Sequence, residues 1–201
     1  MTKLILVKAA QTEWQIQGRL VGDTDLQLNE GGHRQALTDA RAVAQFSPQA
    51  IFCGADGPTK QTAAIIAEEL SLKIKTDAAL REINLGHWEG LTEGDFKERF
   101  SKVYKQWRND PLSVEPPEGE SVSEVAGRLK KSLEKILKRN DGQTILLVLG
   151  RLAYAAARCE LDDRGYGQFW QYVEDEMQWH KIELEMLKND ALASAEKSKS
   201  N

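Results

Sequence analysis

The sequence predicts an α/β fold, a three-layer α/β/α sandwich built on a mostly parallel central sheet. Short apolar runs typical of buried strands occupy residues 4–7, 50–53 and 144–149. Stretches with helical spacing of apolar residues lie between them, and strands that alternate with helices favour a parallel sheet covered on both faces. A chain of 201 residues suits one domain. We expect this domain at residues 1–188, followed by a polar, disordered tail at residues 189–201.

The predicted helices have local start signals. Asn29 is suited to cap a helix over residues 30–45, and Pro58 to open the helix that follows the second strand. A capping box at Ser121 precedes the longest helical pattern in the chain. A helix of small residues, at residues 152–157, follows the third apolar run.

Three further elements rest on shorter patterns. Alternation at residues 72–75 predicts an edge strand, and alternation at residues 182–186 predicts a last strand with one face in water. Thr92 is expected to start a helix that contains Phe96 and Phe100.

Composition excludes several classes of function. The formal charge of −4 offers no electrostatic case for nucleic acid or an anionic membrane as the partner. No apolar run approaches the roughly 20 residues that span a bilayer, and the start of the chain lacks the plan of a signal peptide. The two cysteines, Cys53 and Cys159, have no metal-binding spacing and are too few for a disulfide framework. We expect a cytoplasmic protein with no metal and no cofactor.

Several motifs occur in order along the chain: Gln11-Thr12-Glu13-Trp14 with Gly18-Arg19 and Gly22, then Gln61-Thr62-Ala63, LREINLGHWEGLT at residues 80–92, and PPEGES at residues 116–121. Together they resemble the histidine phosphatase superfamily, in its phosphoglycerate-mutase-like branch. The resemblance extends over residues 3–187 and implies the same layered fold.

The resemblance also implies a chemistry: phosphoryl transfer through a phosphohistidine, with two arginines and a second histidine around the phosphate and an acid that protonates the leaving oxygen. Most of these groups are replaced here. Ala9 stands at the position of the nucleophile, Lys8 and Pro58 at those of the arginines, and Gly150 at that of the second histidine. Only Glu82, at the position of the acid, remains.

These replacements predict a catalytically inactive protein with the histidine phosphatase fold, because loss of a nucleophile alone can cost on the order of 10⁶-fold in rate. Such a protein would have a binding, regulatory or assembly role, with an unknown protein partner or a small ligand, and it could be a homo-oligomer. His33, His87 and His180 stand at none of the catalytic positions. The acidic run at residues 174–176 is interpreted as solvated surface.

Two alternatives remain open. One is a phosphatase or phosphomutase relative with altered chemistry that uses Lys8, Glu82 and Arg151; the other is a small-molecule sensor. Both would use the vestigial pocket, whose expected residues are Lys8, Thr12, Gln15, Arg19, Glu82 and Arg151. We further hypothesise that Arg151 or Lys8 pairs with Glu82 and closes this pocket, since a buried carboxylate needs a partner.

Overall fold

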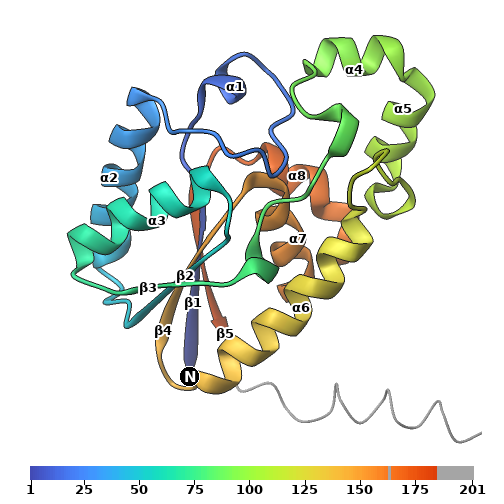
Figure 1. Cartoon of the computed structure of the whole chain (residues 1–201). Helices are drawn as coiled ribbons and strands as arrows, with labels where there is room; N and C mark the ends of the chain where they lie inside the picture. The colour runs from blue at the N-terminus through green and yellow to red at the C-terminus, as the bar shows by residue number, and fades with distance from the viewer. Residues whose placement is uncertain (163, 185–201) are drawn as a thin grey trace, which may run out of the picture.

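A five-stranded sheet forms the centre of the protein, with helices on both faces (Figure 1). The computed structural model describes residues 1–162 and 164–184. The strands are β1 (Thr2–Lys8), β2 (Ala50–Cys53), β3 (Ile74–Thr76), β4 (Thr144–Leu149) and β5 (Trp179–Leu184). Their order is β3-β2-β4-β1-β5, with β1 to β4 parallel and β5 antiparallel to β1. The prediction of a mostly parallel sheet is confirmed.

The helices of the described residues are α1 (Glu13–Ile16), α2 (Glu30–Ala44), α3 (Gly57–Leu70), α4 (Glu93–Arg99), α5 (Ser101–Asn109), α6 (Val122–Arg139), α7 (Arg151–Leu161) and α8 (Phe169–Glu174). Short 3₁₀ turns occur at Ala78–Leu80, Gly86–Trp88, Pro111–Ser113 and Gly165–Gln168.

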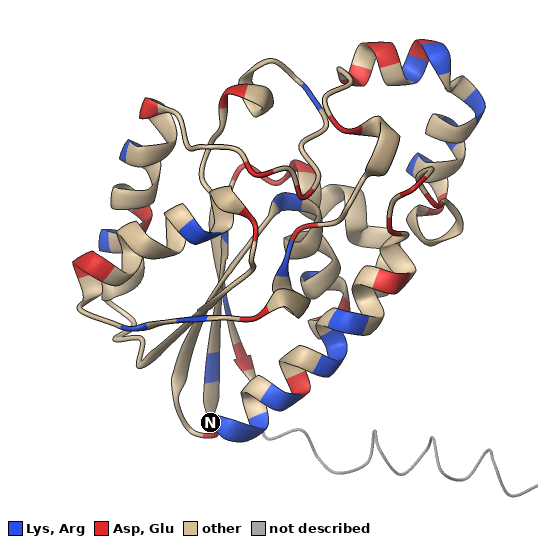
Figure 2. Cartoon of the chain, viewed as in Figure 1, with Lys and Arg blue, Asp and Glu red and all other residues tan. Residues whose placement is uncertain are grey.

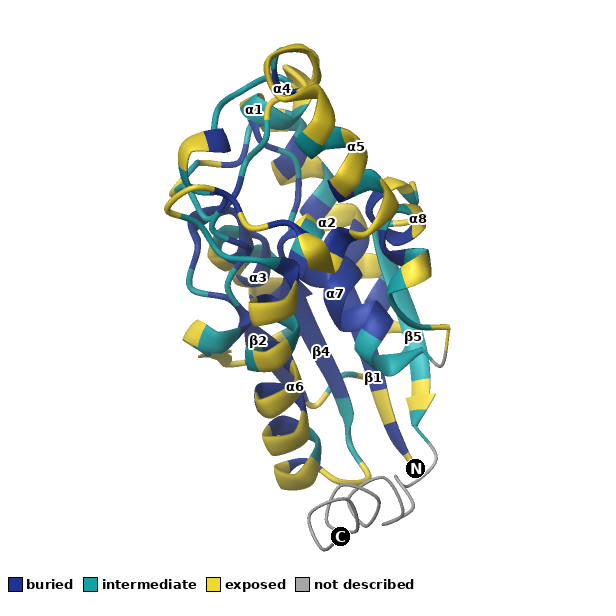
Figure 3. Cartoon of the chain, turned by 90° about the vertical axis from the view of Figure 1, so that its right-hand side faces the viewer, coloured by how far each residue is buried: buried dark blue, intermediate teal, exposed yellow. Residues whose placement is uncertain are grey.

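The alternation of side chains along β1 divides the interior into two cores. Leu4 and Leu6 pack with residues of α6 and α7, whereas Ile5 and Val7 pack with residues of α2 and α3. All four side chains are fully buried, and Figure 3 shows the sheet covered by helices. Successive residues of a strand point to opposite faces, so one strand serves both cores. The three-layer arrangement is therefore as predicted.

The local start signals act as the sequence indicates. The Asn29 side chain accepts a hydrogen bond from the Gly32 backbone N–H (2.7 Å) at the start of α2. Ser121 forms both halves of a capping box before α6. Pro58 lies in the first turn of α3, whose cap is Asp56.

The helix expected from Thr92 is interrupted. It ends at Arg99, the backbone turns at Phe100, and the chain resumes as α5. Phe96 is fully buried against Trp88 and Trp107, whereas Phe100 is 40% exposed. Neither α5 nor α8 was expected, because both are held by aromatic contacts between distant parts of the chain, such as Trp107 against Trp170 with ring centres 4.8 Å apart.

The two edges of the sheet match the predicted edge strand and last strand. The edge strand expected at residues 72–75 is β3, displaced by one or two residues and exposed throughout. The last strand, expected at residues 182–186, is β5 and begins earlier. The predicted domain boundary at residue 188 and the tail at residues 189–201 lie outside the described residues.

Charged residues follow the outer side of α6. Lys130, Lys131 and Lys135 are exposed there together with Glu134, and Figure 2 shows basic residues spaced along α6 from Arg128 to its end. Among the described residues, no helix combines the length and the apolar character that crossing a membrane requires.

One acidic side chain of α2 is buried. Asp39 is 6% exposed, and its Oδ2 has no hydrogen-bond partner among the described residues. Burial raises the pKa of Asp39 to about 6, against the smaller opposing effect of a hydrogen bond with Gln35. The ionised form of Asp39 is therefore unfavourable in the folded protein.

We predict that Asp39→Asn stabilises the protein above pH 6. The pKa of Asp39 in the folded protein lies above its ordinary value of 3.8, so the parent protein loses stability as the pH rises from about 4 to about 6. The asparagine variant lacks this loss, and the difference should level off above pH 6 at on the order of 1 to 3 kcal/mol. Urea unfolding at a series of pH values measures it.

Glu134→Gln is the matched control, because it removes an exposed carboxyl group. This variant should show the same dependence of stability on pH as the parent protein. An Asp39→Asn profile parallel to that of the parent would contradict the prediction.

Candidate active site

The positions at which the resemblance places catalytic groups come together at the carboxyl ends of the parallel strands. Lys8 ends β1, Gly150 follows β4, and Pro58 begins the helix that follows β2. Glu82 comes from the loop between β3 and α4. Ala9 follows Lys8 directly, and the wall of one small cavity contains Ala9, Pro58, Glu82 and Gly150.

 Ala9, Pro58 and Gly150 lie close together because β1, β2 and β4, the strands that precede them, are consecutive in the sheet.

Glu82 is buried, with 5% of its surface exposed. Its Oε1 accepts hydrogen bonds from the backbone N–H groups of Ile83 (2.7 Å) and Ala153 (2.8 Å), and its Oε2 accepts one from that of Leu152 (2.8 Å). Burial raises the pKa of Glu82 to about 7, although the three N–H groups oppose this rise. The carboxyl group can therefore gain and lose a proton near neutral pH.

The contact between Glu82 and α7 requires a glycine at the start of the helix. Gly150 is the N-cap of α7 and has no side chain to accept the first N–H groups, so the carboxyl group of Glu82 accepts them instead. A Cβ atom on Gly150 would lie 2.5 Å from Oε2 of Glu82. A larger side chain at this position is incompatible with the observed place of Glu82.

Lys8, the last residue of β1, is buried at the site, with 4% of its surface exposed. Its Nζ donates a hydrogen bond to the backbone carbonyl of Asp175 and lies 4.9 Å from the ring centre of Tyr154. Burial lowers the pKa of Lys8 to about 8; the charge of Asp175 opposes this, and those of Arg151 and Arg158 add to it.

Arg151 is exposed at the start of α7, and its Nε donates to the carbonyl of Val173 (2.8 Å). Neither Arg151 nor Lys8 pairs with Glu82 among the described residues, so the hypothesis of an internal ion pair is wrong. Lys8 and Arg151 each donate to a backbone carbonyl, and Glu82 accepts from backbone N–H groups. These hydrogen bonds to the backbone offset the cost of burying a charged or polar group, as an ion pair would.

Two adjacent cavities make up the site. The larger has a volume of about 260 Å³, and Lys8 and the acidic run at residues 174–176 are part of its wall. The smaller, next to Glu82, has about 20 Å³, room for about one water molecule. Ala9, Gln15 and Arg151 line both cavities.

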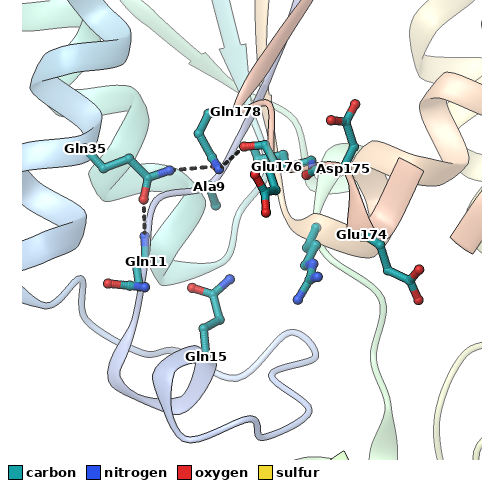
Figure 4. A pocket seen from close by; sticks show the side chains of 10 residues that line it. Ala9, Gln11, Gln15, Gln35, Glu174, Asp175, Glu176 and Gln178 are labelled. Atoms are coloured by element: carbon teal, nitrogen blue, oxygen red, sulfur yellow. Dashed lines mark hydrogen bonds between the residues drawn. The ribbon is translucent and has the colours of Figure 1, made fainter. Parts of the chain in front are cut away.

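Glutamine side chains form one wall of the larger cavity (Figure 4), and of these only Gln15 was expected from the sequence as a pocket residue. Gln35 of α2 accepts a hydrogen bond from the Gln11 backbone N–H (3.3 Å) and donates one to Gln178 (2.7 Å). Gln178 in turn donates to the carbonyl of Glu176 (2.8 Å). No local pattern in the sequence marks Gln11, Gln35 and Gln178 as pocket residues, since they come from three separate segments.

The acidic run at residues 174–176, interpreted from sequence as solvated surface, is exposed at Glu174 and Glu176 and half-buried at Asp175, and it also forms part of the wall of the larger cavity. Glu174 also pairs with Arg108 of α5 (2.6 Å). Within residues 1–162 and 164–184, no three or more His, Cys, Asp or Glu side chains lie where they could hold a metal ion.

The remaining predicted pocket residues differ in their placement. Thr12 is fully buried, and together with Gln15 it forms the capping box of α1; both line the smaller cavity. Arg19 lines neither cavity: it is exposed and donates to the carbonyl of Gly90 (2.7 Å). The structure therefore brings the predicted residues together with the exception of Arg19.

The motifs shared with the family mainly hold the backbone around the site. The hydroxyl of Thr62 accepts from the Ala10 N–H (2.9 Å) and donates to the carbonyl of Pro58 (2.8 Å). Gln61 accepts from the Leu28 N–H (3.1 Å), which fixes the loop before α2. These motif residues therefore hold the start of α3 and the loops after β1 and before α2 in place.

Comparison with known proteins agrees with the fold and the motifs. A family model described as the histidine phosphatase superfamily (branch 1) matches residues 4–194. Phosphoserine phosphatase 1 of Hydrogenobacter thermophilus is 31% identical over 189 residues, which are 94% of this chain and 90% of that protein. A probable phosphoglycerate mutase GpmB of Yersinia enterocolitica is 33% identical over 152 residues, 74% of this chain and 69% of that protein.

Solved structures share the architecture. The YhfR protein of Bacillus stearothermophilus superposes with a TM-score of 0.83 at 25% identity, over 92% of this chain and 93% of that one.

These findings contradict our prediction of a catalytically inactive protein. The relatives are named as a phosphatase and a mutase, which favours the alternative of a phosphatase or phosphomutase relative with altered chemistry. The prediction gave most weight to the replaced positions. The structure adds that the pKa of Glu82 is raised to about 7 and that Lys8 and Arg151 line the adjoining cavities.

We predict that Gly150→Ala destabilises the protein. The added Cβ would displace the carboxyl group of Glu82 and leave the N–H groups of Leu152 and Ala153 without their partner. The expected loss is on the order of 1 to 3 kcal/mol in the free energy of unfolding, measured by chemical denaturation.

Gly127→Ala is the matched control, because Gly127 lies within α6 with nothing within 4 Å of an added Cβ. That variant should be neutral or more stable by about 0.5 to 1 kcal/mol. Equal stability of Gly150→Ala and the parent would refute the role assigned to Glu82.

Proposed function

Because this chain belongs to the histidine phosphatase superfamily, we propose that it is a phosphatase or phosphomutase relative with altered chemistry. In this proposal Lys8, Glu82 and Arg151 act on a phosphomonoester bound at the carboxyl ends of the strands. The observation that carries the proposal is Glu82, a buried carboxyl group whose pKa is raised to about 7 on the cavity that Arg151 also lines.

The two cations would bind the phosphoryl group. The guanidinium of Arg151 can offer two parallel N–H groups to phosphate oxygens, and the ammonium of Lys8 adds a second positive charge. Both residues line the larger cavity, which is the space available for the substrate. Charges fixed in position before the reaction stabilise the transition state without reorganisation.

Water takes the place of the missing histidine as the nucleophile. Its oxygen attacks phosphorus, the P–O bond to the leaving group breaks, and the leaving oxygen takes the proton of the Glu82 carboxyl group. The proton that the attacking water releases restores Glu82. Without a covalent nucleophile, we expect turnover well below the roughly 1 to 10³ s⁻¹ usual for enzymes.

The acidic run at residues 174–176 bears on the choice of substrate. These carboxylates line the same cavity as Lys8 and Arg151, so the wall has charges of both signs. A phosphomonoester that also bears an ammonium group complements this wall better than one with negative charges alone. Phosphoserine is such a compound, and a relative of this chain is named as a phosphoserine phosphatase.

We predict that the purified protein releases phosphate from phosphoserine faster than buffer does, and that Glu82→Gln lowers the rate by about 10²-fold or more. The rate should fall as the pH rises through about 7, where Glu82 loses its proton, and further through about 8, where Lys8 loses its charge. Phosphate release at high protein concentration measures both effects. Thermal unfolding of the variant is recorded alongside, because glutamine can accept fewer of the N–H groups.

Arg19→Gln is the matched control, since Arg19 lines neither cavity, and Arg151→Gln should weaken substrate binding. The proposal fails if no phosphomonoester is hydrolysed above the buffer rate, or if Glu82→Gln and Arg151→Gln hydrolyse it as fast as Arg19→Gln.

A small-molecule sensor is the second candidate. The observation that favours it is that Glu82 lines only the smaller cavity, so a ligand can fill the larger one without meeting the acid. Binding of phosphoserine by calorimetry with no turnover would favour the sensor over the enzyme.

A further inference from the structure

Lys8 differs from the other lysines of the described residues in its surroundings. Lysine side chains are rarely buried unless they pair with an acid, yet Lys8 is 4% exposed and forms no ion pair among the described residues. Its Nζ donates to one neutral carbonyl group, that of Asp175, and lies over the ring of Tyr154. Because no ion pair stabilises its positive charge, the buried amine can lose its proton, and the nitrogen then has a free lone pair.

Burial is the main cause that favours that state, since it lowers the pKa of Lys8. Arg151 and Arg158, both on α7, also repel the ammonium form, whereas the charge of Asp175, a larger effect than that of either arginine, favours it. With a pKa of about 8, about 10% of the amine is unprotonated at pH 7, against about 0.03% for a lysine at 10.5. Burial and neighbouring cations are the conditions under which lysine becomes a nucleophile in proteins.

We propose that Lys8 is a reactive amine that forms an imine with a small aldehyde or ketone bearing a carboxylate or phosphate, bound in the cavity of about 260 Å³ at the end of β1. The nitrogen lone pair attacks the carbonyl carbon and gives a carbinolamine. Loss of water then leaves a C=N bond between the ligand and Nζ. No electrons are gained or lost, and no other reactant is needed.

The anionic group of the ligand follows from Arg151. Its Nε is bound to the carbonyl of Val173, which holds the guanidinium at the cavity, and its Nη atoms bond to no protein group in residues 1–162 and 164–184. A guanidinium in this position can bind a carboxylate or phosphate while the carbonyl carbon faces Lys8. The reaction differs from phosphoryl transfer and does not depend on it.

The test uses glyoxylate, a small anionic aldehyde, with cyanoborohydride, whose hydride reduces the imine carbon to a stable secondary amine. Peptide mapping by mass spectrometry then compares Lys8 with the exposed Lys131 in the same sample. At pH 7 we expect Lys8 to be modified at least 10-fold faster than Lys131. The rate at Lys8 should rise with pH around a midpoint near 8. This comparison within the parent protein requires no variant to fold.

Two variants and a second probe complete the test. Lys8→Arg should remove the fast modification and leave Lys131 unaffected. Arg151→Gln should slow modification by glyoxylate at Lys8 several-fold but not modification by acetaldehyde, which has no anionic group. The proposal is overturned if Lys8 is modified no faster than Lys131. If Arg151→Gln slows modification by both aldehydes equally, the inference that Arg151 binds an anionic group of the ligand is overturned. Since no phosphate release is measured, these outcomes are independent of the proposed phosphatase activity.

Discussion

The site depends on the buried carboxyl group of Glu82 and the backbone N–H groups that it accepts. Removing a carboxyl group from water is costly unless it finds partners, and three N–H groups supply them here. Two of these N–H groups belong to the first turn of α7. The N-cap of this helix, Gly150, has no side chain that could accept them, so the carboxyl group of Glu82 caps the helix. The loop that carries Glu82 and the helix after the central strand therefore hold each other in place.

The replaced catalytic positions fit this arrangement. Gly150 leaves the space that Glu82 occupies, and Pro58 lies in the first turn of α3, where a backbone N–H is not required. Ala9 adds no polar group between the two cavities that it lines. Each of these residues stands where the resemblance to the family implies a group that takes part in phosphoryl transfer, and each fits the observed packing.

Burial has opposite effects on the two titratable groups of the site. It raises the pKa of Glu82 and lowers that of Lys8, because in both cases it disfavours the charged form. Both groups consequently titrate near neutrality, which suits proton transfer by Glu82 and nucleophilic attack by Lys8. They do not neutralise each other, since each already bonds to backbone groups.

The layered fold could be predicted from local signals in the sequence, such as the apolar run at residues 144–149 and the helix cap Asn29. Motifs whose order matches a known family also placed Glu82 and Arg151 in one expected pocket, and both line the smaller cavity. The folded structure was needed to show that backbone N–H groups, not a cation, are the partners of Glu82, and that the acidic run at residues 174–176 lines the larger cavity. These features arise from contacts between segments far apart in the chain, which no local pattern encodes.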